Sequence, residues 1–212
     1  MEKCALAYIE KLYAVETPAM KDTRARIKEN DFSVHISPYE GRLLQTLIHL
    51  GNIKSCVEIG ALGGYSALWL SQALKITGGH LYTCEHDEKR LKMVQETLDN
   101  VDNVTILAGD AAETLPAFSK DHVSVDMVFI DADKKSYLTY LDWAERNVRS
   151  GGLIVADDTL LKGSVYMEAL PYRVRQSTCD TLKTFNKRLS NPARYTSILL
   201  PTDAGLTIAV KK

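Results

Sequence analysis

The sequence predicts an α/β protein whose doubly wound, mostly parallel sheet of seven strands ends in an antiparallel hairpin. Apolar stretches of strand length alternate with stretches of helix length between residues 55 and 157, and parallel strands need such helical crossovers. The tail breaks this alternation, because the strand-like stretches near 195–200 and 206–210 are separated by only five residues. Two strands joined by so short a turn must be antiparallel.

Length and charge limit the possible classes of protein. The chain has 212 residues, which allows one domain with a sizeable core, and no Pro-, Gly- or Ser-rich tract divides it. We therefore expect a single domain over residues 1–212. The 26 Lys and Arg residues are balanced by 27 Asp and Glu residues, for a net charge of -1, so no global basic field attracts nucleic acid.

Cysteine usage and hydropathy predict a cytoplasmic protein. The four cysteines lie far apart without a C-x-x-C spacing, and Cys56 and Cys84 fall in expected buried strands, a pattern typical of a reducing compartment. The N-terminus does not read as a secretory signal, and no run approaches 18 apolar residues. We therefore expect no association with a membrane.

The first part of the chain is expected to be helical. Apolar residues at helical spacing predict a helix over 2–14. Residues 20–29 form a more polar candidate, whose charge run we interpret as a solvated face rather than a phosphate patch. Ser37, Pro38 and Glu40 supply a capping residue, a proline at the first helical position and a glutamate three residues on, which predicts that the next helix begins there.

The remaining elements alternate along the chain. Strands are expected near 55–60, 80–85, 104–108, 125–131 and 152–157, with helices near 64–75, 88–101, 111–118, 136–148 and 178–190. In such a sheet, ligands bind at the carboxyl ends of the strands. The residues that follow each strand are therefore the candidates for a functional site.

A glycine turn follows the first strand. It contains Gly60, Gly63 and Gly64, which let the backbone approach a ligand where a Cβ would collide, next to the positive end of a helix. The spacing is not the G-x-G-x-x-G of dinucleotide-binding proteins, and the carboxylate of Glu58 would repel a pyrophosphate. A cationic ligand such as S-adenosylmethionine fits better, although an ordinary tight connection explains a glycine turn taken alone about equally well.

Two later strand ends favour a nucleoside site. Glu85 ends the second strand about 20 residues beyond the turn, where a ribose diol needs an acceptor. Asp110 and Ala111 follow the third strand. We expect these three strand ends to meet at one nucleoside.

Carboxylates also follow the fourth and fifth strands. Asp131 comes after the fourth strand, and Asp157 and Asp158 come after the fifth. Three carboxylates placed together would raise the pKa of at least one of them, and a bound divalent cation removes that repulsion. Oxygen donors without nearby His or Cys favour Mg, Mn or Ca over Zn. The alternative, which fits any single one of these aspartates better, is a helix cap or a turn.

Several motifs together resemble the cation-dependent O-methyltransferases, a family that includes caffeoyl-CoA and catechol O-methyltransferases. They are Glu58-Ile59-Gly60 with Gly64-Tyr65-Ser66, Phe129-Ile130-Asp131-Ala132-Asp133-Lys134 with Tyr137, Gly151-Gly152, Gly163-Ser164-Val165, and Leu200-Pro201 with Gly205-Leu206-Thr207. The similarity runs from about residue 37 to the C-terminus. It implies the Rossmann-like fold of class I methyltransferases, S-adenosylmethionine as methyl donor, a divalent cation and a homodimer.

The resemblance also implies a role for each matched residue. Lys134 is the expected general base. The expected metal ligands are Asp131, Asp157 and Asp158, and because the family more often has asparagine at the third position, the identity of the metal stays open. Asp133 is expected near the methionine end of the cofactor. The expected cofactor contacts are Ile36, Glu40, Glu58, Gly60, Ser66, Glu85, Asp110, Ala111 and Asp131.

The leading interpretation is an enzyme that methylates a hydroxyl of a small catechol-like or caffeoyl-type phenolic substrate. The alternative is a tRNA hydroxyuridine O-methyltransferase, which a basic rim formed by residues 21–28 with Arg173 and Arg175 would favour. A non-catalytic S-adenosylmethionine-binding protein and a nicotinamide dehydrogenase fit the motifs less well. We expect residues 1–36, a helical extension, to contribute to the substrate pocket or to a dimer contact, and residues 160–178 to form another wall of the pocket.

Overall fold

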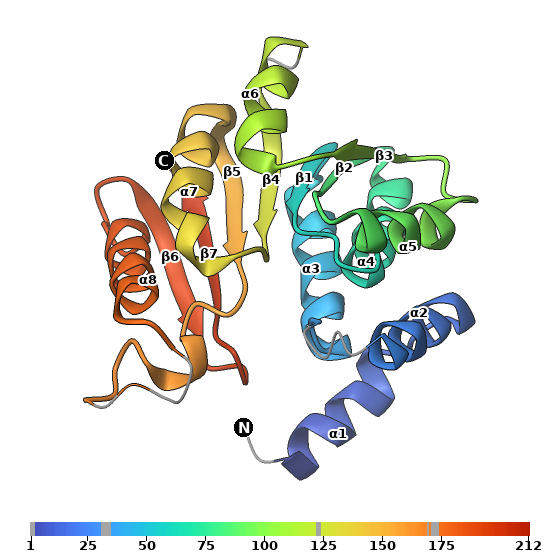
Figure 1. Cartoon of the computed structure of the whole chain (residues 1–212), viewed down its shortest axis with the longest axis horizontal. Helices are drawn as coiled ribbons and strands as arrows, with labels where there is room; N and C mark the ends of the chain where they lie inside the picture. The colour runs from blue at the N-terminus through green and yellow to red at the C-terminus, as the bar shows by residue number, and fades with distance from the viewer. Residues whose placement is uncertain (1–2, 31–34, 122–123, 169, 171–173) are drawn as a thin grey trace. The chain divides into compact units, whose positions relative to one another are not determined.

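The computed structural model describes residues 3–30, 35–121, 124–168, 170 and 174–212. The chain divides into two compact units, Met1–Ala111 and Ala112–Lys212, which carry the blue to green and the green to red parts of the ribbon in Figure 1. In the ranges that the structure describes, no helix has the length and apolar character needed to cross a membrane.

The first unit contains the expected helical N-terminus followed by three strands. Its elements are α1 (Lys3–Tyr13), α2 (Pro18–Glu29), α3 (Pro38–Gly51), β1 (Ser55–Ile59), α4 (Tyr65–Thr77), β2 (His80–Glu85), α5 (Glu88–Leu98) and β3 (Val104–Ala108). The strands are parallel and lie in the order β3-β2-β1. Their register pairs Ile59 with Cys84 and Glu85 with Ala108. The three strands therefore end side by side, as the sequence predicts.

Capping residues set where the helices of this unit begin. The Thr17 hydroxyl accepts a hydrogen bond from the Met20 amide at the start of α2, and proline follows at the first helical position. At the start of α3, the hydroxyl of Ser37 accepts from the Glu40 amide while the Glu40 carboxylate accepts from the Ser37 amide, which is the predicted capping box. Each cap satisfies amides that a helix leaves without a partner.

The second unit contains the remaining four strands. Its elements are α6 (Ala111–Asp121), β4 (Val125–Ile130), the short 3-10 turn η1 (Lys134–Ser136), α7 (Tyr137–Asn147), β5 (Val148–Ala156), η2 (Leu161–Gly163), α8 (Gln176–Leu189), β6 (Tyr195–Leu200) and β7 (Leu206–Lys211). The strand order is β4-β5-β7-β6, with β4 parallel to β5 and with β7 antiparallel to both β5 and β6. The predicted fold class is confirmed: seven mostly parallel strands that alternate with helices and end in an antiparallel hairpin.

Strand β5 begins four residues earlier than the sequence suggests. Val148 is buried and pairs with Val125, and the register then shifts before Met127 pairs with Leu153. Gly152 allows this, because a Cβ there would lie 2.7 Å from the carbonyl oxygen of Asp126. The glycine pair Gly151-Gly152 is therefore part of an irregular strand.

The hairpin turn fixes the segment that follows β5. The amides of Thr159 and Leu160 donate to the carbonyls of Gly205 and Ala204, each at 2.9 Å. Gly205 has φ 86°, and a Cβ at that position would collide with Leu160. The tail thus holds the backbone immediately after Asp158, which itself has a left-handed φ of 54°.

Candidate active site

The glycine turn of the first unit is shaped by Glu85. Oε2 of Glu85 accepts from the amide of Leu62 at 2.9 Å, and Oε1 accepts from the amides of His86 and Asp87 at 2.9 and 3.0 Å. The carboxylate is only 3% exposed. Its first task is therefore to hold the turn, including Leu62 at a left-handed φ of 54°, a conformation that a leucine rarely adopts without outside support.

The other expected cofactor residues on β1 and β3 gather at the same strand ends. The amides of Gly60 and Ala61 both donate to the Cys84 carbonyl, at 3.1 and 3.0 Å. Glu58 is fully buried opposite Thr83, whose hydroxyl donates to it. The Gly109 amide donates to the Glu85 carbonyl at 2.9 Å. The expected contacts at the ends of the three strands are Glu58, Gly60, Glu85, Asp110 and Ala111.

Two expected cofactor residues, Glu40 and Ser66, belong to helices, and a third, Ile36, precedes α3. Ser66 is buried in the first turn of α4. The Glu40 carboxylate accepts from the amide and the hydroxyl of Ser37, both at 2.8 Å, so it serves the capping box. The ring of His35, the neighbour of Ile36, lies 5.2 Å from the ring of Tyr65 at the end of the turn. This contact brings the start of α3 to the glycine turn.

Carboxylates meet in the second unit at the ends of β4 and β5. The register pairs Ile130 with Ala156, and the Asp157 amide donates to the Ile130 carbonyl at 3.0 Å. Asp131 and Asp157 therefore follow neighbouring strand ends, as the sequence predicts. The Lys134 ammonium lies 3.0 Å from Oδ1 of Asp131 and 3.7 Å from Oδ2 of Asp158.

Tyr137 completes this cluster. The Lys134 ammonium donates to the Tyr137 hydroxyl oxygen at 2.8 Å, and that hydroxyl donates to the Asp157 carbonyl at 2.7 Å. The tyrosine is fully buried, and burial raises its pKa. It is thus a neutral link between the lysine and the backbone after β5.

The charges of the cluster favour a protonated lysine. Burial opposes the charge of Lys134, but the hydrogen bond to Tyr137 and the carboxylates of Asp131 and Asp158 together outweigh burial, so the pKa of Lys134 is raised. Burial also raises the pKa of Asp158, although the lysine charge opposes this. To accept a proton, Lys134 needs a second positive charge nearby, because a like charge disfavours the ammonium form.

The donor set fits a hard divalent cation. Asp131 and Asp158 already hold one cation, the Lys134 ammonium, between two strand ends. Within the described ranges, no three His, Cys, Asp or Glu side chains converge as a ready-made metal centre. Mg²⁺ commonly takes only one or two carboxylates and fills its other positions with water and substrate oxygens. Such a partial protein site is what these residues can provide.

Asp133, which the resemblance places near the methionine end of the cofactor, lies just before η1 and α7. Its carboxylate accepts from the hydroxyls of Ser136 and Tyr140, at 2.7 and 3.0 Å, so it fixes the start of α7. Arg175 is exposed, and Arg173 lies outside the described residues. Sequence reasoning named Tyr137 only as part of a motif, although its place three residues after Lys134, one helical turn on, is the signal that the two side chains meet.

Comparisons with known proteins agree on one family. The sequence matches the model of a family described as O-methyltransferase over residues 10–212. It is 36% identical over 166 residues to a catechol O-methyltransferase of Niastella koreensis, which covers 76% of this chain and 75% of that one. It is 31% identical over 205 residues to caffeoyl-CoA O-methyltransferase 1 of Eucalyptus globulus, covering 93% and 83%. The solved O-methyltransferase TomG of Streptomyces achromogenes, in complex with SAM, matches with a TM-score of 0.87 and 27% identity over 100% of this chain and 99% of that one.

Proposed function

The chain belongs to the O-methyltransferase family, and on that premise we propose that it methylates a hydroxyl of a small catechol-like or caffeoyl-type phenol with the help of a divalent cation. The enzyme class is an S-adenosylmethionine-dependent O-methyltransferase. The observation that carries the finer proposal is the meeting of Asp131, Asp158 and Lys134 at the ends of β4 and β5.

The cofactor is proposed to bind at the glycine turn of the first unit. The carboxylates of Glu58 and Glu85, both buried, supply negative charge for a ligand whose sulfonium and amino groups are positive. The left-handed backbone at Gly60 and Gly64 opens the turn where a Cβ would intrude. Ile36, Glu40, Ser66, Asp110, Ala111 and Asp131 remain proposed contacts on the strength of the resemblance.

Lys134 is proposed to take the proton of the reacting hydroxyl. The substrate oxygen then forms a bond to the methyl carbon, the bond between that carbon and sulfur breaks, and S-adenosylhomocysteine leaves. Tyr137 holds the lysine nitrogen at 2.8 Å, which orients it for the transfer. General base catalysis of this kind commonly contributes 10²- to 10⁴-fold in rate.

Asp131, Asp157 and Asp158 are the proposed ligands of the divalent cation. When bound, the cation would offset their charges and lower the pKa of a coordinated hydroxyl. A substrate with two adjacent oxygens suits a site in which the protein supplies few ligands. We therefore expect the enzyme to methylate a vicinal diol faster than a simple phenol.

The arginines of α2 give little support to the alternative of an RNA substrate. Arg24 is paired with Glu16 at 2.7 Å, and Arg26 contacts Asp22, Glu96 and Thr97. Both arginines thus make ion pairs within the first unit, which compete with binding of phosphates. We therefore favour the phenolic substrate.

A homodimer is proposed from the resemblance and from the exposed apolar residues of α1 and of the segment that follows it. Tyr8, Leu12, Tyr13 and Val15 are all more than half exposed, and a second copy could cover this apolar group. Sedimentation at micromolar concentration tests the proposal, and a monomeric mass would refute it.

The substrate class is tested by methyl transfer from labelled S-adenosylmethionine. The acceptors are a panel of catechols, a caffeoyl ester and bulk tRNA, each with Mg²⁺ present. Labelling of a vicinal diol but not of the matching monophenol is expected. Labelling of tRNA alone would contradict the phenolic substrate and would indicate an RNA-modifying enzyme.

A further inference from the structure

We propose that Arg26 of α2 and Thr97 of α5 form a positioning relay, which holds the glycine turn in the shape that binds S-adenosylmethionine. The inference rests on the proposed placement of the cofactor at this turn. It gives the polar helix α2, whose charges read from sequence as a solvated face, a part in cofactor affinity.

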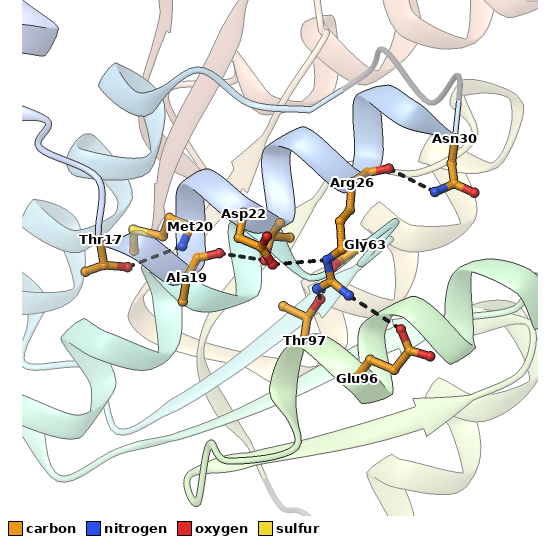
Figure 2. A network of polar contacts seen from close by, with 10 residues as sticks. Thr17, Ala19, Met20, Asp22, Arg26, Asn30, Gly63, Glu96 and Thr97 are labelled. Carbon is orange, nitrogen blue, oxygen red and sulfur yellow. Dashed lines mark hydrogen bonds and ion pairs between the residues drawn. The ribbon is translucent and has the colours of Figure 1, made fainter.

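The relay runs from a side chain on one helix to the backbone of the turn. Arg26 donates to the Thr97 hydroxyl oxygen at 2.8 Å, and the same hydroxyl donates to the Gly63 carbonyl at 2.8 Å. Figure 2 shows the guanidinium of Arg26 reaching from α2 to Thr97 and to Glu96 on α5. Two helices far apart in sequence thus converge on one peptide group.

Donor and acceptor roles give the relay a direction. A guanidinium has only donors, so the oxygen of Thr97 must accept from it. The single hydroxyl proton is then left for the carbonyl of Gly63, and the charged donor strengthens that second bond. The exposed ion pairs of Arg26 with Asp22 and Glu96, each at 3.4 Å, add little by themselves.

The turn needs support from this side because its backbone is unusual. Gly60, Leu62 and Gly64 have φ of 101°, 54° and 87°, and a leucine in that region is strained. Glu85 holds the turn through the Leu62 amide. Thr97 holds it through the carbonyl of Gly63. The strained Leu62 is therefore held by a hydrogen bond on each side.

Close packing couples the same turn to α2. A Cβ at Gly63 would lie 2.6 Å from Cγ1 of Ile27 and 2.7 Å from Sδ of Met93. Ile27 is on α2 and fully buried, and Met93 is on α5 and buried. With this little space, a displacement of α2 must move the turn.

Matched substitutions test the relay through cofactor affinity. Thr97→Val removes the hydroxyl at nearly constant shape, and Arg26→Met removes the donor. Titration calorimetry with S-adenosylmethionine is expected to show Kd raised about two- to tenfold for each, the range for one hydrogen bond. In steady-state assays, KM for the cofactor rises while kcat changes less. Thr97→Ser, which keeps the hydroxyl, restores the affinity.

Controls separate positioning from general destabilisation. Thr181→Val changes another helical threonine, whose hydroxyl bonds only to the Ser177 carbonyl in the described contacts, and Lys28→Met removes an exposed charge from α2. Both should leave Kd unchanged. If Thr97→Val and Arg26→Met lower the melting temperature without changing Kd, the residues are merely structural and the relay is refuted.

A further variant distinguishes failure of the relay from failure of the proposed cofactor site. Glu85→Gln alters the group that holds the turn directly. If Glu85→Gln weakens S-adenosylmethionine binding while Thr97→Val does not, the proposed cofactor site is supported and the relay is refuted. If the wild-type protein binds S-adenosylmethionine and neither variant matters, the cofactor does not bind at this turn and both proposals fail.

Discussion

The ammonium of Lys134 lies 2.8 Å from the hydroxyl oxygen of Tyr137, which in turn donates to the Asp157 carbonyl. The lysine is therefore tied to the backbone after β5 as well as to the carboxylates of Asp131 and Asp158. A flexible side chain is held in one place by three contacts. This arrangement leads to the first two predictions.

Replacing Lys134 removes the proposed base. Lys134→Met should lower kcat roughly 100-fold or more, the lower part of the range for general base catalysis. The calorimetric Kd for S-adenosylmethionine should stay the same, because Glu58 and Glu85 are untouched. Lys135→Met is the matched control, since that neighbouring side chain is exposed. Equal activity of the two variants would contradict the role of Lys134 as the general base.

Replacing Tyr137 should loosen the lysine without removing it. Tyr137→Phe keeps the packing of this buried ring against Phe185, whose centroid is 5.2 Å away, but loses both hydrogen bonds. We expect kcat to fall about tenfold and the melting temperature to fall by several degrees, since a hydrogen bond to a charged group contributes about 1.5 to 3 kcal/mol. Unchanged kcat would show that the carboxylates alone position Lys134.

Asp158 occupies a backbone conformation that restricts what can replace it. Its φ is 54°, a region in which aspartate and asparagine are enriched. Asp158→Asn should therefore fold normally while removing one charge from the proposed metal site. The Mg²⁺ concentration for half-maximal activity should rise about tenfold or more. A variant with the same Mg²⁺ requirement would show that the charge of Asp158 does not contribute to binding of the cation.

Glu145 should make the stability of the second unit depend on pH. Burial would raise the pKa of Glu145, but hydrogen bonds from Tyr195, Arg188 and Arg194 outweigh burial and lower it. Its contribution is therefore present above its unfolded pKa, about 4.3, and is lost as the pH falls through the lower folded pKa.

A double comparison isolates this contribution. Urea unfolding of the wild type and of Glu145→Gln should differ by about 2 kcal/mol near pH 7, and the difference should shrink below about pH 4. The carboxylate contacts Arg188 at 2.7 Å and Arg194 at 3.0 Å, so both ion pairs are lost together. A difference that stays constant between pH 3 and pH 7 would contradict this assignment.

Local patterns were sufficient to predict the elements and the fold class. Strand and helix periods, the capping box at Ser37 and the short turn before Leu206 each act over a few residues, so sequence alone carries them. The irregular start of β5 was not predictable in this way. Val148 belongs to the strand because of its partner Val125, and such pairing is a tertiary property.

The candidate site was predictable by position but not by contact. Asp131 and Asp157 were placed at neighbouring strand ends by topology alone. The use of Glu85 to hold the turn, of Asp133 to fix α7, and of Thr97 to reach Gly63 depends on side-chain direction. These contacts do not follow a fixed spacing in the sequence, so no sequence motif predicts them.

The proposed metal-assisted methyl transfer is tested most directly by the cation dependence of catechol methylation. The rate is measured with S-adenosylmethionine and a catechol after treatment with a chelator, and again after Mg²⁺, Mn²⁺ or Ca²⁺ is restored. We predict that the chelator abolishes the activity, that at least one of these cations restores it, and that Asp131→Asn cannot be restored at the same concentration. A catechol methylation rate that is unaffected by the chelator would contradict the proposal.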